Sequence, residues 1–223
     1  MKEIKGGVTT PKGFKAAGVE AGIKYQNRKD MALVYSECMA HAAGVFTTNV
    51  VKAASVYWDK KIVSEKKEAK AVVLNSGIAN ACTSEEGNRL NEFLAASIAE
   101  QLEIDKEEVL TASTGVIGMQ LKEEPIRSGA VKLVENLDNT VEAGTLAAEA
   151  IMTTDTVSKQ CAVEFFIQNT KVTIGGMSKG SGMIHPNMAT MLSVVTTDAN
   201  IGVEELQEIL SEDVKDSFNM ISV

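Results

Sequence analysis

Thr190 follows Ala189 at the end of a glycine-rich loop, and together these residues could form a self-activating nucleophile. Four glycines, a lysine and a proline lie between residues 175 and 188, and an apolar run begins at Met191. A threonine hydroxyl is a weak nucleophile unless a base lies beside it, and its own α-amino group becomes such a base if the chain is cut before it. We therefore predict Thr190 as the catalytic residue. Its β-branched type is also typical of an ordinary strand, and on position alone that alternative stays open.

The chemistry expected of Thr190 has two stages. Its hydroxyl attacks the carbonyl of Ala189, which moves the acyl group from nitrogen to oxygen, and water then hydrolyses the ester. The cut leaves Thr190 with a free α-amine that can act as general base for its own hydroxyl. The same hydroxyl can then accept an acyl group from a substrate.

An acyl-transfer nucleophile also requires hydrogen-bond donors for the oxyanion that develops on the substrate. Ser113, Thr114 and Gly115 lie where a short predicted strand gives way to a loop. The Thr114 hydroxyl and the Gly115 N–H could be two such donors, because glycine permits close approach to the backbone. A simple turn explains the same residues on sequence alone.

Lys179 is the only lysine or arginine between residues 172 and 188. It could anchor a substrate carboxylate, or it could be a solvated loop lysine. The surrounding glycines do not form a nucleotide phosphate loop, because Gly180 is followed by Ser181 rather than by lysine and a hydroxyl residue.

The composition is that of an ordinary globular protein. The 223 residues are 44% hydrophobic and 23% charged, and the formal net charge of −8 argues against nucleic acid as the main partner. Two histidines are too few for a histidine-based metal site, so no metal is expected. The three cysteines have no metal-ligand spacing and are expected to be reduced and buried.

The chain shows no targeting or membrane signal. Its first residues contain no apolar core of signal-peptide length, and no apolar run approaches the ~20 residues of a membrane helix. We therefore expect a soluble, cytoplasmic protein without a membrane partner.

Short β-like runs alternate with amphipathic helical ones, which favours an α+β fold. Strands are predicted at residues 31–37, 43–48, 54–58, 70–75, 109–113, 160–167, 170–176 and 190–197. Helices are predicted at residues 84–103, 123–136, 140–151 and 203–217. The strands at 160–167 and 170–176 are expected to form a hairpin across Gln168 and Asn169.

Seven segments in a fixed order resemble the ornithine acetyltransferase family (bifunctional glutamate N-acetyltransferase) of arginine biosynthesis. The segment around the predicted cleavage site, KGSGMIHPNMATML, is the most specific of them. The others are GGVTTPKGF from Gly6, RKDMAL from Arg28, AGVFTTN from Ala43, LNSGIANACT from Leu74, STGVIG from Ser113 and IMTTDT from Ile151.

The resemblance implies a fold and a set of site residues. The family folds as helices packed on stacked mixed β-sheets, an αββα-like sandwich of the N-terminal-nucleophile type. It places its cleavage at the bond matching Ala189–Thr190 and its oxyanion donors at the positions of Thr114 and Gly115. Thr153 and Lys179 match its substrate-binding residues, together with Thr190 itself. Asp155 is expected to orient its loop rather than to react.

The resemblance also implies a reaction. An acetyl group passes from N2-acetylornithine to Thr190 and then to glutamate, with no cofactor, although acetyl-CoA is an alternative donor in some members. The cut divides the chain into an α-chain region, 1–189, and the start of a β-chain region, 190–223. The two chains pair in a heterotetramer.

Family members are longer than this chain and take further active-site residues, including a glutamate, from their C-terminal part. We therefore expect a fragment that lacks this part, and an inactive truncated product is one alternative. The other is an N-terminal-threonine amidohydrolase or aminopeptidase of related fold, which would admit water in place of glutamate.

Overall fold

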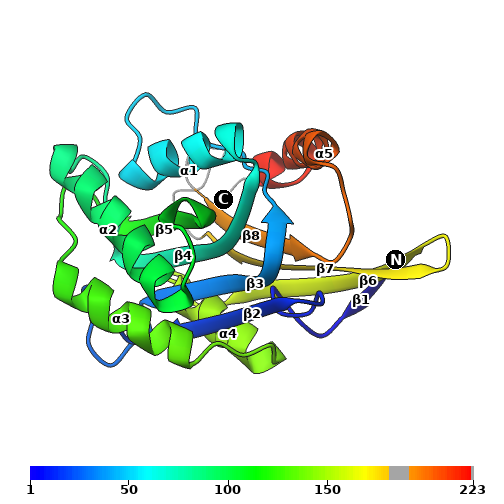
Figure 1. Cartoon of the computed structure of the whole chain (residues 1–223), viewed down its shortest axis with the longest axis horizontal. Coiled ribbons are helices and arrows are strands. Elements are labelled where there is room, and N and C mark those ends of the chain that lie inside the picture. The colour runs from blue at the N-terminus through cyan, green and yellow to red at the C-terminus, as the bar shows by residue number, and fades with distance from the viewer. Residues whose placement is uncertain (181–190, 222–223) are drawn as a thin grey trace.

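The computed structural model describes residues 1–180 and 191–221, and these residues form two four-stranded sheets with five α-helices (Figure 1). The sheets share a hydrophobic core, which joins strand residues of both. The expected α+β class, with helices packed on stacked sheets, is confirmed.

The first sheet is mixed, and its central strands are buried on both faces. Its strands, in spatial order, are β2 (Phe14–Val19), β3 (Met31–His41), β4 (Glu68–Ile78) and β5 (Val109–Val116). β2, β3 and β4 are antiparallel neighbours, and β5 runs parallel to β4. Leu33 and Val73 face one core while Val34 and Leu74 face the other, which explains why these strands read as continuous apolar runs.

The second sheet is antiparallel. Its strands, in spatial order, are β1 (Lys2–Ile4), β6 (Lys159–Ile167), β7 (Thr170–Lys179) and β8 (Leu192–Thr197). The expected hairpin joins β6 to β7, and Gln168 takes a left-handed φ of 54° in its turn. The pairing of β6 with β7 therefore reaches Ile167 and Thr170, the two residues on either side of this turn.

All but the last of the five described α-helices pack against strands of the first sheet. The helices are α1 (Ala54–Glu65), α2 (Ser84–Leu102), α3 (Glu123–Glu135), α4 (Val141–Ala150) and α5 (Val203–Asp216). Leu94 and Ile98 of α2 and Ile126 and Leu133 of α3 are fully buried in the first core. None of the described helices is long and apolar enough to cross a membrane.

Helix α4 contacts strands of both sheets and lies very close to β2. A Cβ added at Gly18 would lie 2.0 Å from the carbonyl oxygen of Leu146, so only glycine allows this approach. Because α4 ends at Ala150, its position fixes where the following loop, 151–158, begins.

Two predicted strands are wrong. Residues 54–58 belong to helix α1, which is tied to β5 by tertiary contacts: the Trp58 indole donates to the carbonyl of Val109 at 2.9 Å. Residues 43–48 form no strand, and Gly44 instead exchanges hydrogen bonds with the side chain of Gln207. In both places long-range contacts override the local β preference.

The expectation of buried cysteines is also wrong, because Cys38, Cys82 and Cys161 are all exposed. Cys38 lies where the pairing of β3 with β4 shifts register, between Tyr35 and Ala40. Cys82 has a left-handed φ of 57° in a loop. Local backbone geometry therefore outweighs the general tendency of free cysteine to be buried.

Candidate active site

The predicted cleavage site, Ala189–Thr190, lies outside the described residues, but the strands on either side of it are described. Lys179, the last residue of β7, pairs with Leu192, the first residue of β8. The Ser178 hydroxyl donates to the carbonyl of Leu192 at 3.5 Å. The chain therefore leaves β7 and enters β8 at the same place, beside Lys179.

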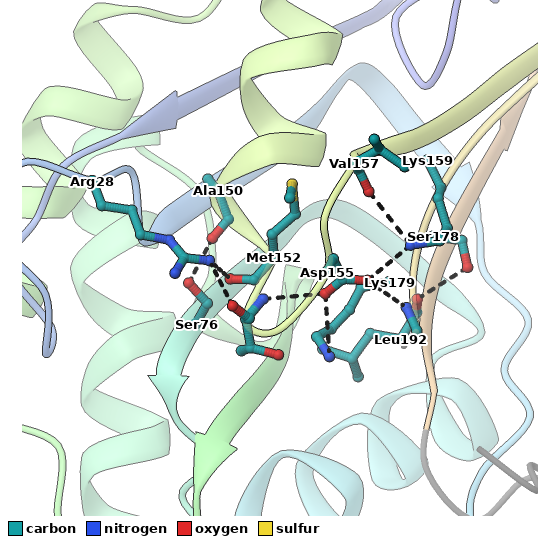
Figure 2. Close-up of polar contacts among 12 residues, drawn as sticks. Arg28, Ser76, Ala150, Met152, Asp155, Val157, Lys159, Ser178, Lys179 and Leu192 are labelled. Carbon is teal, nitrogen blue, oxygen red and sulfur yellow. Dashed lines mark hydrogen bonds and ion pairs between the residues drawn. The ribbon is translucent and has the colours of Figure 1, made fainter. Parts of the chain in front are cut away.

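Lys179 is held at this place by a buried carboxylate. Its Nζ lies 3.6 Å from Oδ2 of Asp155, and the two side chains are 12% and 1% exposed. Figure 2 shows the Asp155 carboxylate between Lys159 and Lys179. The Lys159 ammonium donates to Asp155 Oδ1 at 2.9 Å.

Asp155 also accepts two backbone hydrogen bonds. Thr153 N–H donates to Oδ2 at 3.2 Å and Gly180 N–H donates to Oδ1 at 3.2 Å. The carboxylate thus fastens the loop after α4 to the end of β7, in agreement with the orienting role expected for it.

Its surroundings favour the charged form of this carboxyl group. Burial by itself raises the pKa of Asp155, but the hydrogen bonds from Lys159 and Thr153 and the positive charge of Lys179 outweigh it. Together they lower the pKa from 3.8 to about 2. Asp155 is therefore a fixed negative charge at neutral pH.

Thr153 is held from its other side by Arg28. The guanidinium donates from Nη2 to the carbonyls of Met152 at 2.5 Å and of Thr153 at 3.1 Å. It also lies 4.8 Å from the centre of the Tyr25 ring, in a cation–π contact. Two independent anchors, Arg28 and Asp155, therefore position the backbone of Thr153.

Thr114 and Gly115 lie at the carboxyl end of β5, next to the end of β4. Gly115 pairs with Gly77 and has a φ of 133°, and a Cβ there would lie 2.3 Å from the carbonyl carbon of Gly77. Only glycine fits this position. Gly115 is exposed and Thr114 is partly exposed, so both are accessible to a small molecule.

Strand β4 links these two residues to the Thr153 loop. Ser76 pairs with Thr114, and its buried hydroxyl donates to the carbonyl of Ala150 at 2.7 Å. Ala150 stands three residues before Thr153. The structure thus connects the predicted oxyanion donors and the predicted substrate-binding residues through consecutive contacts.

An open pocket of about 560 Å³ adjoins the Thr153 loop. Its charged and polar lining includes Glu20, Arg28, Lys29, Glu149, Thr153 and Asp155. Lys29 and Glu149 form an ion pair across it at 3.2 Å. Its volume lies within the ~300–1,000 Å³ that is usual for small-molecule sites.

Sequence reasoning did not identify Arg28 and Lys159 as site residues. Arg28 lies 125 positions from Thr153, and nothing in its local spacing signals the contact. Lys159 stands four residues after Asp155 but begins a strand, so a helical pairing rule does not apply. Within residues 1–180 and 191–221, no group of three metal-ligating side chains is placed to hold a metal ion.

Comparison with known proteins gives one family. The family model that matches, over residues 15–223, is described as the ArgJ family. The chain is 47% identical over 222 residues to the arginine biosynthesis bifunctional protein ArgJ of Synechococcus, covering 100% of this chain and 53% of that protein. It is 48% identical over 223 residues to the protein of that name in Caldanaerobacter subterraneus, covering 100% and 54%. The chain therefore spans about half the length of the curated relatives it matches.

Solved structures give the same family. The arginine biosynthesis bifunctional protein of Bacillus halodurans matches with a TM-score of 0.79 and 38% identity, over 85% of this chain and 97% of that one. An ornithine acetyltransferase from Mycobacterium tuberculosis, complexed with ornithine, matches with a TM-score of 0.77 and 41% identity, over 84% and 97%.

A more distant structure shares the fold alone. It is the L-aminopeptidase D-Ala-esterase/amidase of Ochrobactrum anthropi, described as a variant of the Ntn hydrolase fold. It matches with a TM-score of 0.55 and 10% identity, over 98% of this chain and 70% of that one.

Proposed function

The chain belongs to the ArgJ family, and from this premise we propose that it carries the nucleophile of an acetyltransferase. The reaction moves an acetyl group from N2-acetylornithine to glutamate in arginine biosynthesis. The observation that carries the proposal is the position of Lys179, 12% exposed beside the Asp155 carboxylate, at the strand pair that flanks the predicted cleavage site.

The proposed reaction begins with self-cleavage. The Thr190 hydroxyl attacks the Ala189 carbonyl, the Ala189–Thr190 amide bond breaks as an ester forms, and water hydrolyses that ester. Ala189 becomes a carboxylate terminus and Thr190 an amino terminus. The new amine lies next to the hydroxyl it must deprotonate, so no further base is required.

Acetyl transfer then follows a ping-pong route. Thr190 Oγ attacks the acetyl carbonyl of the donor and passes its proton to its own amine, and the collapse of the tetrahedral intermediate releases ornithine. The Thr114 hydroxyl and the Gly115 N–H are the proposed donors to the oxyanion; removing one such donor typically lowers the rate by ~10²–10³. The α-amine of glutamate then attacks the acetyl-threonine ester and restores Thr190.

Lys179 and Thr153 are the proposed substrate-binding residues. The ammonium of Lys179 suits a substrate carboxylate, and Asp155 positions Lys179 through an ion pair and Thr153 through a backbone hydrogen bond. The relative from Mycobacterium tuberculosis, whose structure contains ornithine, supports an ornithine-derived donor. No cofactor enters this route, and acetyl-CoA is a further donor that the same nucleophile could accept.

The relatives are about twice the length of this chain, and the proposed activity belongs to the whole enzyme. The remaining substrate contacts and the pairing of α and β chains in a heterotetramer are part of the proposal. The regions 1–189 and 190–223 would then fall into different chains of that assembly.

An N-terminal-threonine amidohydrolase is the second candidate function, because the aminopeptidase of Ochrobactrum anthropi shares the fold. The two candidates differ only in the group that attacks the acyl-threonine ester. Water would give acetate, whereas glutamate gives N-acetylglutamate.

The test is the release of ornithine from N2-acetylornithine by the whole enzyme, measured with and without glutamate. We expect release to depend on glutamate, with one N-acetylglutamate formed per ornithine, and to vanish in Thr190→Ala. Thr170→Ala, at the exposed start of β7, is the matched control and should retain full activity. Glutamate-independent release with acetate as product would favour the amidohydrolase, and no release at all by the whole enzyme would overturn the proposal.

A further inference from the structure

Two lysines from neighbouring strands share one buried carboxylate. Lys159 begins β6 and Lys179 ends β7, and their ammonium groups contact different oxygens of Asp155. Lys159 donates a hydrogen bond at 2.9 Å, whereas Lys179, at 3.6 Å, makes an ion pair longer than a hydrogen bond. Asp155 therefore accepts a hydrogen bond from Lys159 and makes an ion pair without a hydrogen bond with Lys179.

This cluster carries one surplus positive charge, because two ammonium groups face one carboxylate. The adjoining pocket does not cancel that charge. Its lining residues Arg28 and Lys29 are balanced by Glu20 and Glu149, and Asp155 already belongs to the cluster. The surplus charge arises only because Lys159 is present.

We propose that Lys159 is a positioning residue for substrate binding: by taking up the charge of Asp155, it leaves Lys179 available to bind the carboxylate of the amino-acid substrate. The inference rests on the proposed function, in which Lys179 binds that carboxylate. Without Lys159, the nearest counter-charge of Lys179 would be Asp155 itself, and the cluster would be neutral. A neutral cluster gives no net attraction to an incoming anion.

The position of Lys159 suits this indirect role. Its side chain is 43% exposed, compared with 12% for Lys179, and its ammonium also lies 3.4 Å from the carbonyl of Val157. A neutral side chain of similar length at this position would create no cavity in the core. Removal of the charge can therefore be tested without a large loss of packing.

The experiment compares two donors and three variants. The donors are N2-acetylornithine and its carboxamide, which lacks the carboxylate charge. The variants are Lys159→Gln, Lys159→Arg and the control Lys171→Gln, which removes an exposed lysine of the same sheet that pairs with Glu164. The readouts are kcat and KM for ornithine release in the presence of glutamate.

We expect Lys159→Gln to raise KM for N2-acetylornithine roughly tenfold, as the loss of one nearby charge implies. The KM for the carboxamide should change by less than about twofold, and kcat should be retained for both donors, because the charge acts on binding. Lys159→Arg should restore the KM of the wild type, and Lys171→Gln should leave all parameters unchanged.

Two results would overturn the inference alone. One is an unchanged KM for N2-acetylornithine in Lys159→Gln. The other is an equal rise of KM for both donors, which would show a structural role without dependence on the carboxylate. A whole wild-type enzyme that releases ornithine from neither donor would instead overturn the proposed function, and the inference with it.

Discussion

At the scale of single residues, the sequence and the family resemblance predict site residues but not the side chains that hold those residues in place. Residue type and the resemblance to a known family predict Thr114, Gly115, Thr153 and Lys179 as site residues, and the structure connects these positions through β4 and Asp155. Arg28, by contrast, acts through carbonyl groups more than a hundred positions away. Such contacts depend on the three-dimensional path of the chain, and local sequence spacing does not encode them.

Gly115 provides a prediction at this scale, because its close approach to Gly77 leaves no room for a side chain. Gly115→Ala should destabilise the protein by about 3 kcal/mol or more, since a left-handed backbone and a clash with fixed backbone atoms add together. The free energy of unfolding, measured by urea denaturation, checks this.

Gly118→Ala is the matched control. Gly118 also has a left-handed φ, of 77°, but a Cβ there would meet no atom within 4 Å. Only the backbone strain then remains, about 1 kcal/mol. Equal losses in the two variants would contradict the steric account of Gly115.

At the scale of elements, segments with a clear pattern of apolar residues could be predicted from the sequence. Segments whose form depends on tertiary contacts could not. The helix predicted at 84–103 matches α2, whose apolar residues recur at helical spacing. The strand predicted at 70–75 lies within β4, whose apolar residues form a continuous run. Helix α1 was missed since its first turns contain Val56, Tyr57 and Trp58, which favour strands. Its helical form depends on tertiary contacts with the open edge of β5.

Asp59 is one of these contacts and leads to a pH prediction. Its Oδ1 accepts hydrogen bonds from Thr111 N–H at 2.8 Å and from the Thr111 hydroxyl at 3.2 Å. Burial raises the pKa of Asp59 from 3.8 to about 7, although both bonds from Thr111 lower it. The folded state therefore holds this proton more tightly than the unfolded state does.

The sign of the effect follows from this difference. The stability contributed by the protonated Asp59 is fully present below pH 3.8 and is lost as the pH rises towards about 7. Asp59→Asn keeps an acceptor for Thr111 without the buried charge. At pH 8 we expect the variant to be more stable than the wild type by on the order of 2 kcal/mol.

Urea denaturation at pH 5 and at pH 8 measures this effect. The advantage of Asp59→Asn should be larger at pH 8, with a matching rise in the midpoint of unfolding. A variant that is less stable at pH 8 would show instead that the charged carboxylate is favourable at this site.

At the scale of the whole molecule, two stacked sheets bring the ends of β4, β5 and β7 into one connected site (Figure 1). The α+β class could be predicted from alternating patterns, but the stacking of the sheets came only from the family resemblance. Strand order and parallel pairing, such as β5 beside β4, arise from contacts between distant segments. Local periodicity does not determine these contacts.

The central claim is that Thr190 becomes an N-terminal nucleophile by self-cleavage, and the most direct test is the intact mass of the purified protein beside a Thr190→Ala variant. The wild type should give two fragments, residues 1–189 and a second that starts at Thr190, whereas the variant should give one uncut mass. An uncut wild type, or identical fragments in both proteins, would contradict the assignment of Thr190.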